Sequence, residues 1–244
     1  MLRELNEVGS TNTWLLENQE GLPDLFTVYT FRQTAGRGQT GNSWESEPGK
    51  NLSFSTLFRL SSIEQTTRLN MLIPLAVVRV IGENIGAVGP LTIKWPNDIY
   101  WGEKKLAGLL NENVFAGNRP VCSVAGVGLN VNQEVFRSDA PNPVSLKQIT
   151  GREYELVPLL EAIVREFAEL RPLLERPKEL RDEYMARLFR REGLHRFQVS
   201  STSPKGAEEF LAAIHDVDEF GRLILKTEDG LLHTFGFKEI RFVL

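Results

Sequence analysis

The sequence predicts an α+β fold: a mixed or antiparallel sheet with flanking helices, followed by a small carboxy-terminal β-barrel. Three observations support this class. Strand-like segments early in the chain are separated by tight turns, two amphipathic helical stretches follow them, and the pattern is purely β from Phe197 onward. We therefore expect a main domain over residues 1–192 and a barrel domain over residues 193–244.

The first expected element is a helix over Thr11–Gln19, with Ser10 or Thr11 as its cap because a hydroxyl there accepts from free backbone amides. Apolar residues then keep a helical spacing from Leu69 to Ile85, although Pro74 should kink or divide that helix. Strands are expected over Thr27–Arg32, Asn51–Arg59, Leu91–Trp95, Asp98–Trp101, Lys105–Val114 and Val121–Ala125.

Turn residues set the remaining boundaries. Pro96 favours extended backbone before it and ends one strand, and Gly102-Glu103-Lys104 supplies a tight turn between the next two. Two further helices and a final strand are expected over Val157–Leu170, Lys178–Arg190 and Ile240–Leu244. Within the barrel, turns are expected at Phe220-Gly221 and Glu228-Asp229-Gly230.

Composition excludes several classes of protein. The 244 residues, 41% of them hydrophobic, can bury one substantial core and a small satellite. A net charge of −4 argues against nucleic acid as a partner. The single Cys122 excludes an internal disulfide, and His195, His215 and His233 are too scattered to suggest a metal cluster. No signal peptide or membrane-spanning run is visible, so we expect a cytoplasmic protein without a membrane partner.

A glycine-rich loop begins at Gly36, with three glycines within six residues that let a backbone approach a phosphate closely. Its spacing matches a dinucleotide fingerprint, but no helical pattern follows it. It fails as a P-loop because Asn42 replaces the phosphate-binding lysine. A hairpin loop without a ligand is the alternative, so other motifs must decide.

Two further clusters supply such motifs: Lys94-Trp95-Pro96-Asn97-Asp98 with Lys105-Leu106-Ala107-Gly108, and Gly126-Val127-Gly128-Leu129-Asn130. Asn97 and Asp98 come at a strand end, and Lys105 near the start of a strand can point into a cleft. The alternative is that these lysines are solvated charges of an edge strand, which we favour for Lys104.

Together with Ser10-Thr11-Asn12 near the start and Gln33-Thr34-Ala35 before the glycine-rich loop, these motifs resemble those of the biotin protein ligase family, the biotin–[acetyl-CoA-carboxylase] ligases. The motifs cover roughly the first 130 residues. The resemblance implies a class II synthetase-like catalytic fold shared by biotin and lipoate ligases, with an SH3-like barrel behind it. It also implies ATP and Mg²⁺ as co-substrate and metal, biotin as substrate and no tightly bound cofactor.

The reaction that the resemblance implies has two steps. Biotin is activated to biotinyl-5′-AMP and then transferred to a lysine of a biotin carboxyl carrier protein. The resemblance assigns catalysis to Lys105, Arg37 and Asp98. It assigns biotin binding to Ser10, Thr11, Asn12, Gln33, Gly36, Arg37, Gly38, Lys105 and Gly108. It assigns ATP and adenylate binding to Arg37, Gly38, Gln39, Trp44, Lys94, Asn97, Lys105 and Asn130. Glu112 is either a magnesium ligand or a solvated strand carboxylate.

The chain departs from the family pattern at Gln39 and Thr40, where many members carry basic residues. We hypothesise that this less positive loop orders less tightly around the adenylate, since two charge-assisted phosphate contacts are missing. The motif Ser10-Thr11-Asn12 lies almost at the start, so we expect a ligase without an operator-binding domain.

Several questions stay open at the level of sequence. A lipoate protein ligase and a non-catalytic sensor of biotin or biotinyl-adenylate are the alternatives to the biotin ligase. A monomer and a homodimer are both open, because the strand within Val121–Gly128 can pair across a dimer or lie inside the monomer's sheet.

Overall fold

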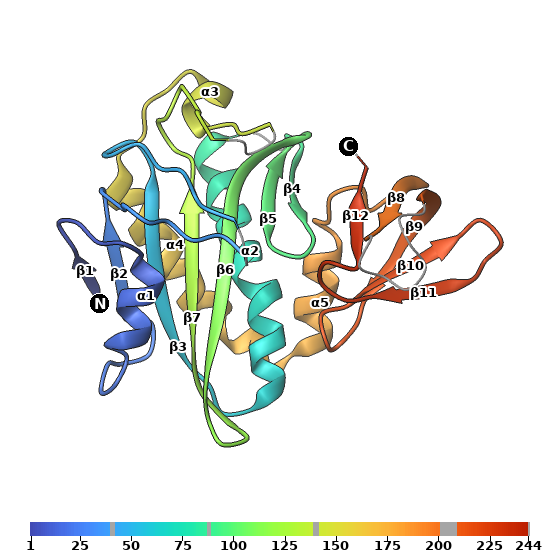
Figure 1. Ribbon diagram of the computed structural model, residues 1–244, viewed down its shortest axis with the longest axis horizontal. Coiled ribbons are helices and arrows are strands. Elements are labelled where there is room, and N and C mark those ends of the chain that lie inside the picture. The colour runs from blue at the N-terminus through green and yellow to red at the C-terminus, as the bar shows by residue number, and fades with distance from the viewer. Residues whose placement is uncertain (40–41, 87–88, 139–141, 201–208, 244) are drawn as a thin grey trace.

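The computed structural model describes residues 1–39, 42–86, 89–138, 142–200 and 209–243. A seven-stranded sheet with helices on both faces forms the larger part, and a five-stranded sheet forms the carboxy-terminal part (Figure 1). This architecture confirms the α+β fold class that the sequence predicts.

Each helix and strand has the following bounds. The helices are α1 (Thr11–Glu17), α2 (Ile63–Ile85), α3 (Leu146–Thr150), α4 (Leu156–Leu170), the 3₁₀ helix η1 (Arg171–Glu175) and α5 (Pro177–Met185). The strands of the large sheet are β1 (Leu2–Glu4), β2 (Thr27–Thr30), β3 (Leu52–Arg59), β4 (Leu91–Lys94), β5 (Asp98–Trp101), β6 (Lys104–Ala116) and β7 (Arg119–Leu129). Those of the small sheet are β8 (His195–Val199), β9 (Glu209–Val217), β10 (Leu223–Thr227), β11 (Leu232–Phe235) and β12 (Ile240–Phe242).

The large sheet is mixed. Its strand order is β1-β2-β3-β7-β6-β5-β4; β1 and β2 pair in parallel, and the other neighbours pair antiparallel. The strand predicted at Val121–Ala125 is part of β7, which lies between β3 and β6 inside the monomer's sheet. Its backbone is therefore not free to pair across a dimer.

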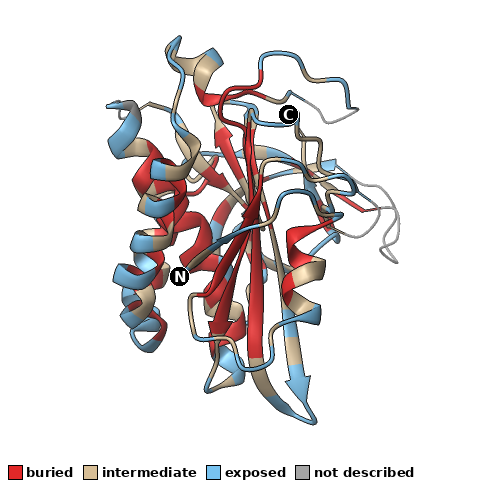
Figure 2. Ribbon diagram, turned by 90° about the vertical axis from the view of Figure 1, so that its left-hand side faces the viewer, coloured by how far each residue is buried: buried red, intermediate tan, exposed pale blue. Residues whose placement is uncertain are grey.

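Helices cover the two faces of this sheet unequally. On one face, α2 and α4 pack on a large core that includes Phe54 and Phe58 of β3. On the other, α1 covers a smaller cluster that includes Leu57 and the buried, free Cys122. Side chains of one strand alternate between faces, so β3 contributes to both cores. Figure 2 shows the buried residues along the strands and the inner sides of the helices. No helix of the described residues is long and apolar enough to cross a membrane.

Pro74, which we expect to kink or divide its helix, lies inside α2. Pro74 does not divide the helix, since α2 runs unbroken from Ile63 to Ile85. A proline removes one backbone hydrogen bond, and here its neighbours Leu72, Ile73 and Leu75 are fully buried, so packing offsets that loss. The helix expected over Lys178–Arg190 ends earlier, at Met185.

The carboxy-terminal part packs against the larger part of the chain. The strand order of its sheet is β11-β10-β9-β8-β12, all antiparallel, consistent with the expected SH3-like barrel. The Trp95 indole donates to the Gly221 carbonyl at 2.9 Å, and the Phe189 and Phe242 rings lie 5.9 Å apart. One hydrophobic core extends through both parts. The expected boundary between residues 192 and 193 lies just before β8, and the division into two domains stays a prediction.

Candidate functional site

A pocket lies between the amino-terminal end of α1, the glycine-rich loop and the strands β5, β6 and β7. Most of the residues singled out from the sequence border it: Ser10, Thr11, Asn12, Gln33, Arg37, Gly38, Gln39, Trp44, Asn97, Asp98, Lys105 and Gly108. Four others lie outside its lining: Gly36, Lys94, Glu112 and Asn130. Segments more than 100 residues apart in the chain thus meet at one site.

The start of α1 supplies a cluster of neutral hydrogen-bonding groups. Ser10 is the helix cap, and its hydroxyl accepts from the Thr13 amide at 3.5 Å. The Thr11 backbone amide donates to Gln33 Oε1 at 3.0 Å, and the Thr11 hydroxyl accepts a hydrogen bond from the Ser55 hydroxyl at 2.8 Å. Because Ser10 and Thr11 are buried and uncharged, this end of the pocket suits an uncharged polar group.

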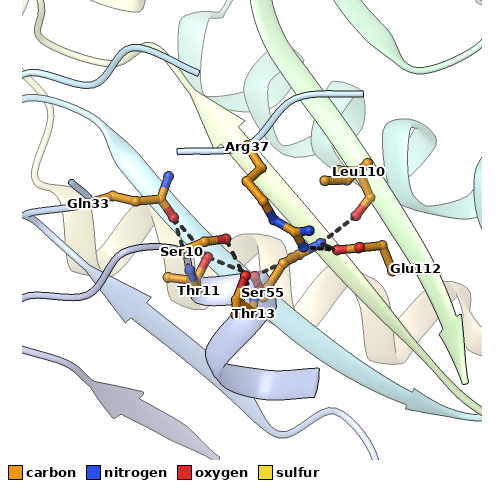
Figure 3. A network of polar contacts seen from close by, with 9 residues as sticks. Ser10, Thr11, Thr13, Gln33, Arg37, Ser55, Leu110 and Glu112 are labelled. Carbon is orange, nitrogen blue, oxygen red and sulfur yellow. Dashed lines mark hydrogen bonds and ion pairs between the residues drawn. The ribbon is translucent and has the colours of Figure 1, made fainter. Parts of the chain in front are cut away.

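Asn12 joins this cluster to the charged side of the site. Figure 3 shows Gln33 and Thr11 on one side of this network and Arg37 and Glu112 on the other. Its Nδ2 donates to the Leu110 carbonyl at 3.0 Å and to Glu112 Oε2 at 2.9 Å. Its Oδ1 accepts from the Ser55 hydroxyl. A Cβ at Gly126 would overlap the Asn12 amide, so the bare backbone of β7 is what admits this side chain.

The described parts of the glycine-rich loop, residues 36–39 and 42–44, lie antiparallel to each other, and the described residues 45–51 that come next contain no helix. Arg37 and Ser43 form an isolated bridge, and the Gly38 amide donates to the Asn42 carbonyl at 2.9 Å. Gly36 lies in the first of these parts, where a Cβ would overlap the Trp44 carbonyl. Thr40 and Gly41 lie outside the described residues. The loop therefore differs from both nucleotide-binding motifs that the sequence analysis rejects.

The Trp44 ring packs against the backbone of two paired glycines, which we call the glycine floor. Gly108 of β6 pairs with Gly128 of β7, and a Cβ on either would press into the Trp44 ring. The Trp44 indole N–H is buried and has no hydrogen-bond partner among the described residues. A buried donor without a partner is costly, and this one lies against the Gly128 backbone.

Two ion pairs bring the charged residues together. Lys105 Nζ lies 2.7 Å from Asp98 Oδ1, and the Arg37 guanidinium pairs with Glu112. Lys105 also lies 5.8 Å from the centre of the Trp44 ring. Arg37 and Lys105 both border the pocket, so two cations face the space beside the neutral cluster.

Two of the residues outside the lining make other contacts. Lys94 Nζ donates to the Tyr100 hydroxyl at 3.1 Å and lies 5.5 Å from the Phe242 ring. Burial lowers the pKa of this lysine below its ordinary value. Asn130 is buried, and its Nδ2 donates to the Val144 carbonyl at 3.1 Å, which fixes the loop before α3. None of these contacts is with a residue that borders the pocket.

Sequence reasoning missed two contributors. Ser55 connects Thr11 to Asn12, and its only signal is that Ser53 and Ser55 alternate with aromatic or apolar residues along a buried strand. Gly126 and Gly128 were recognised as small residues but not as the surface on which Asn12 and Trp44 lie. The described residues contain no group of three His, Cys, Asp or Glu side chains that could hold a metal ion.

Comparison with known proteins identifies relatives of this chain. The model of the biotin/lipoate A/B protein ligase family matches residues 5–130. The chain is 27% identical over 232 residues to the biotin–[acetyl-CoA-carboxylase] ligase of Paracoccus denitrificans, covering 93% of this chain and 94% of that protein. It is 32% identical over 148 residues to the bifunctional ligase/repressor BirA of Bacillus subtilis, covering 58% of this chain. The aligned part spans less than half of that relative, at 44% of its length.

Solved structures share the fold over nearly the whole chain. The biotin protein ligase of Aquifex aeolicus in complex with biotin and ATP superposes with a TM-score of 0.79 at 24% identity and covers 99% of both chains. The biotin protein ligase of Leishmania major in complex with biotinyl-5-AMP superposes with a TM-score of 0.66 at 20% identity, covering 97% of this chain and 98% of that one.

Proposed function

The chain belongs to the biotin/lipoate A/B protein ligase family, and from that premise we propose that it is an ATP-dependent biotin protein ligase. It activates biotin to biotinyl-5′-AMP and transfers the biotinyl group to a lysine of a biotin carboxyl carrier protein. One observation carries this proposal: a buried cluster of neutral donors and acceptors lies in the same pocket as two cations, Arg37 and Lys105.

The neutral cluster is the proposed place for the ureido ring of biotin. That ring offers both N–H donors and a carbonyl acceptor but no charge, which matches the hydroxyls of Ser10 and Thr11 and the amides of Asn12 and Gln33. A lipoyl dithiolane ring has no such groups and would make no comparable hydrogen bonds with this cluster. The composition of the pocket therefore favours biotin over lipoate.

In the first half-reaction a carboxylate oxygen of biotin attacks the α-phosphorus of ATP. A new oxygen–phosphorus bond forms, the bond to the β-phosphate breaks, and pyrophosphate leaves. Carboxylate and triphosphate repel each other, so the site must neutralise charge and align the two groups. Arg37 and Lys105 are the proposed sources of positive charge, and Gly36 and Gly38 let the loop backbone approach the phosphate.

In the second half-reaction the amine of a carrier lysine attacks the acyl carbon of the adenylate. A carbon–nitrogen bond forms, AMP leaves and the amine loses a proton. Asp98 borders the pocket beside Lys105, and we assign to it the orientation of the incoming amine. Once Lys105 turns to a reactant oxyanion, the Asp98 carboxylate has free lone pairs for that amine.

The nucleotide-side residues complete the assignment. Trp44 closes the pocket over the adenylate. Gln39 and Asn97 border the same space, and Gly108 leaves room for close packing. Lys94 and Asn130 lie outside the lining of this pocket, and their part in ATP binding stays a prediction.

In this proposal Mg²⁺ binds to the site together with ATP, because proteins commonly hold this ion through substrate phosphates and one or two carboxylates. Glu112 does not fit as its protein ligand, because it lies outside the pocket lining and its Oε2 already accepts from Asn12 and Arg37. An enzyme that consumes ATP needs a compartment that supplies it, and we propose the cytoplasm.

The first test is ATP–pyrophosphate exchange with magnesium, measured with biotin and, separately, with lipoate. Biotin-dependent exchange is the expected result, because adenylation needs no carrier. Exchange with lipoate alone would move the chain to lipoate ligation. Tight binding of biotin without exchange would make it a sensor.

A further inference from the structure

Glu112 has an environment that neither of its sequence-based roles explains. It lies on β6, its side chain is 29% exposed, and its Oε2 accepts from both Asn12 and the Arg37 guanidinium. Glu112 does not border the pocket, whereas both of its partners do. The carboxylate therefore lies behind the lining side chains.

Asn12 fixes the direction of this carboxylate. The Asn12 amide uses both N–H donors, one on the Leu110 carbonyl and one on Glu112, and its oxygen accepts from the buried Ser55 hydroxyl. Ser55 is itself held by contact with Thr11 (Figure 3). A side chain with every polar atom engaged has little freedom to rotate, so Glu112 receives a rigid support from within the sheet.

Glu112 in turn holds one nitrogen of the Arg37 guanidinium. The bond joins Nη2 of Arg37 to Oε2 of Glu112, and no other hydrogen bond or ion pair of the Arg37 side chain occurs among the described residues. A guanidinium has five N–H donors in a planar fork. Glu112 therefore holds one nitrogen of the guanidinium from the side away from the pocket. The other N–H donors of Arg37 are oriented by this contact and stay free for a ligand.

We propose that Glu112 is a positioning residue that holds Arg37 in place for the oxyanions of the adenylation step and is not a magnesium ligand. This inference rests on the proposed ligase function. Its chemistry is a charge-assisted hydrogen bond that aligns a cation before the reactants arrive, so less reorganisation is needed when negative charge develops. Through Asn12, the same network ties the position of Arg37 to the neutral cluster.

A magnesium ligand at this position would be in a different environment. A divalent cation seeks carboxylate oxygens with free lone pairs and is repelled by a guanidinium. Oε2 of Glu112 accepts hydrogen bonds from the Arg37 guanidinium and from the Asn12 amide. The two roles therefore make different predictions. Loss of a magnesium ligand would raise the magnesium concentration that the reaction needs, whereas loss of a residue that positions Arg37 would matter only when Arg37 is present.

The test compares Glu112→Gln, Arg37→Met and the double variant with the wild-type protein in biotin-dependent ATP–pyrophosphate exchange. Gln keeps the shape and an acceptor for Asn12 but removes the charge. The control is Glu153→Gln, which removes an exposed carboxylate paired with Lys147 far along the chain, between α3 and α4. A thermal unfolding curve is recorded for every variant to check that the variant is folded.

We expect Glu112→Gln to lower kcat by about 10²-fold, the loss that a small misplacement of a reacting group produces, with KM for biotin unchanged. In the Arg37→Met background the same substitution should cause no further loss, because its effect passes through Arg37. The magnesium concentration for half-maximal rate should equal that of the wild type.

A raised magnesium requirement in Glu112→Gln, an equal loss in the Arg37→Met background, or an unchanged kcat would each overturn the proposal. Absence of exchange in the wild-type protein would instead reject the ligase function on which it rests. The two failures are distinguishable, since the first requires an active wild-type protein.

Discussion

Lys105 Nζ lies 2.7 Å from Asp98 Oδ1, and the two side chains are 25% and 22% exposed. Local structure brings them together. Asp98 begins β5 and Lys105 lies near the start of β6, and the hairpin between them turns at Gly102, whose φ is +57°. The turn pairs Tyr100 with Lys105 and Asp98 with Gly108, so Asp98 lies diagonally across from Lys105 on the neighbouring strand, where a long lysine side chain reaches it.

Replacement of Lys105 by Met tests the cation of this pair. We expect the rate of biotin-dependent exchange to fall by about 10²- to 10³-fold, as when one stabilising group for a developing oxyanion is removed. The dissociation constant for biotin, measured by calorimetry, should change much less, because the neutral cluster remains intact. Lys104→Met is the matched control, since this neighbouring lysine is exposed. Unchanged turnover in Lys105→Met would remove the residue from the mechanism.

The fold was predictable where the signal is local. The cap at Ser10, the hairpin at Gly102 and the apolar spacing in α2 each depend on neighbouring residues, and each appears in the structure. The short strand β1 and the helix α3 were not expected, because three and five residues give too few repeats for a periodic pattern. At Pro74 the local signal for a division of the helix fails, because α2 continues through buried neighbours that are far from the strands they pack on in sequence.

The candidate site was predictable as a set of motifs but not as a surface. Strand alternation requires Lys94 and Trp95 to face different sides, yet the sequence does not say which side holds the pocket. The pairing of Gly108 with Gly128 depends on the register of β6 and β7, which no single segment specifies. Glu112 could not be distinguished from a metal ligand until its contact with Arg37 was known.

The glycine floor under Trp44 gives a second prediction. A methyl group at Gly128 would overlap the indole ring, so Gly128→Ala should displace Trp44 and weaken binding of ATP more than binding of biotin. Gly82→Ala is the control, because Gly82 lies inside α2 with open space around its Cβ position. That change should stabilise the protein by about 0.5–1 kcal/mol. Equal ATP affinity in Gly128→Ala and wild type, measured by calorimetry, would contradict the proposed role of Trp44.

The uncharged loop residues give a third prediction. Gln39 borders the pocket, and Thr40 follows it outside the described residues. Substituting both by arginine adds two candidates for charge-assisted contacts with the adenylate phosphate, so biotinyl-adenylate should dissociate more slowly from the variant. Release of radiolabelled adenylate measures this rate directly. Equal rates in the variant and the native loop would refute the hypothesis that the native loop holds its adenylate less tightly.

Lys94 provides a prediction about pH. Burial lowers its pKa, with Lys105 and Arg190 adding to the decrease and Asp98 opposing it. In the window between that lowered pKa and the ordinary value of 10.5, the folded protein has released the proton and the unfolded chain still holds it. Stability rises with pH wherever the unfolded state binds more protons. Wild-type protein should therefore gain free energy of unfolding relative to Lys94→Met as pH rises through this window.

Urea unfolding of both proteins at several pH values up to about 10.5, the unperturbed pKa of a lysine, measures this difference. Tyr100 also has a raised pKa because of its burial, but it is present in both proteins and largely cancels in the comparison. Lys104→Met, which removes an exposed ammonium, should show no such trend. A difference between wild type and Lys94→Met that stays flat or falls with pH would show that the Lys94 ammonium is solvated, and its contacts with Tyr100 and Phe242 would then not persist in solution.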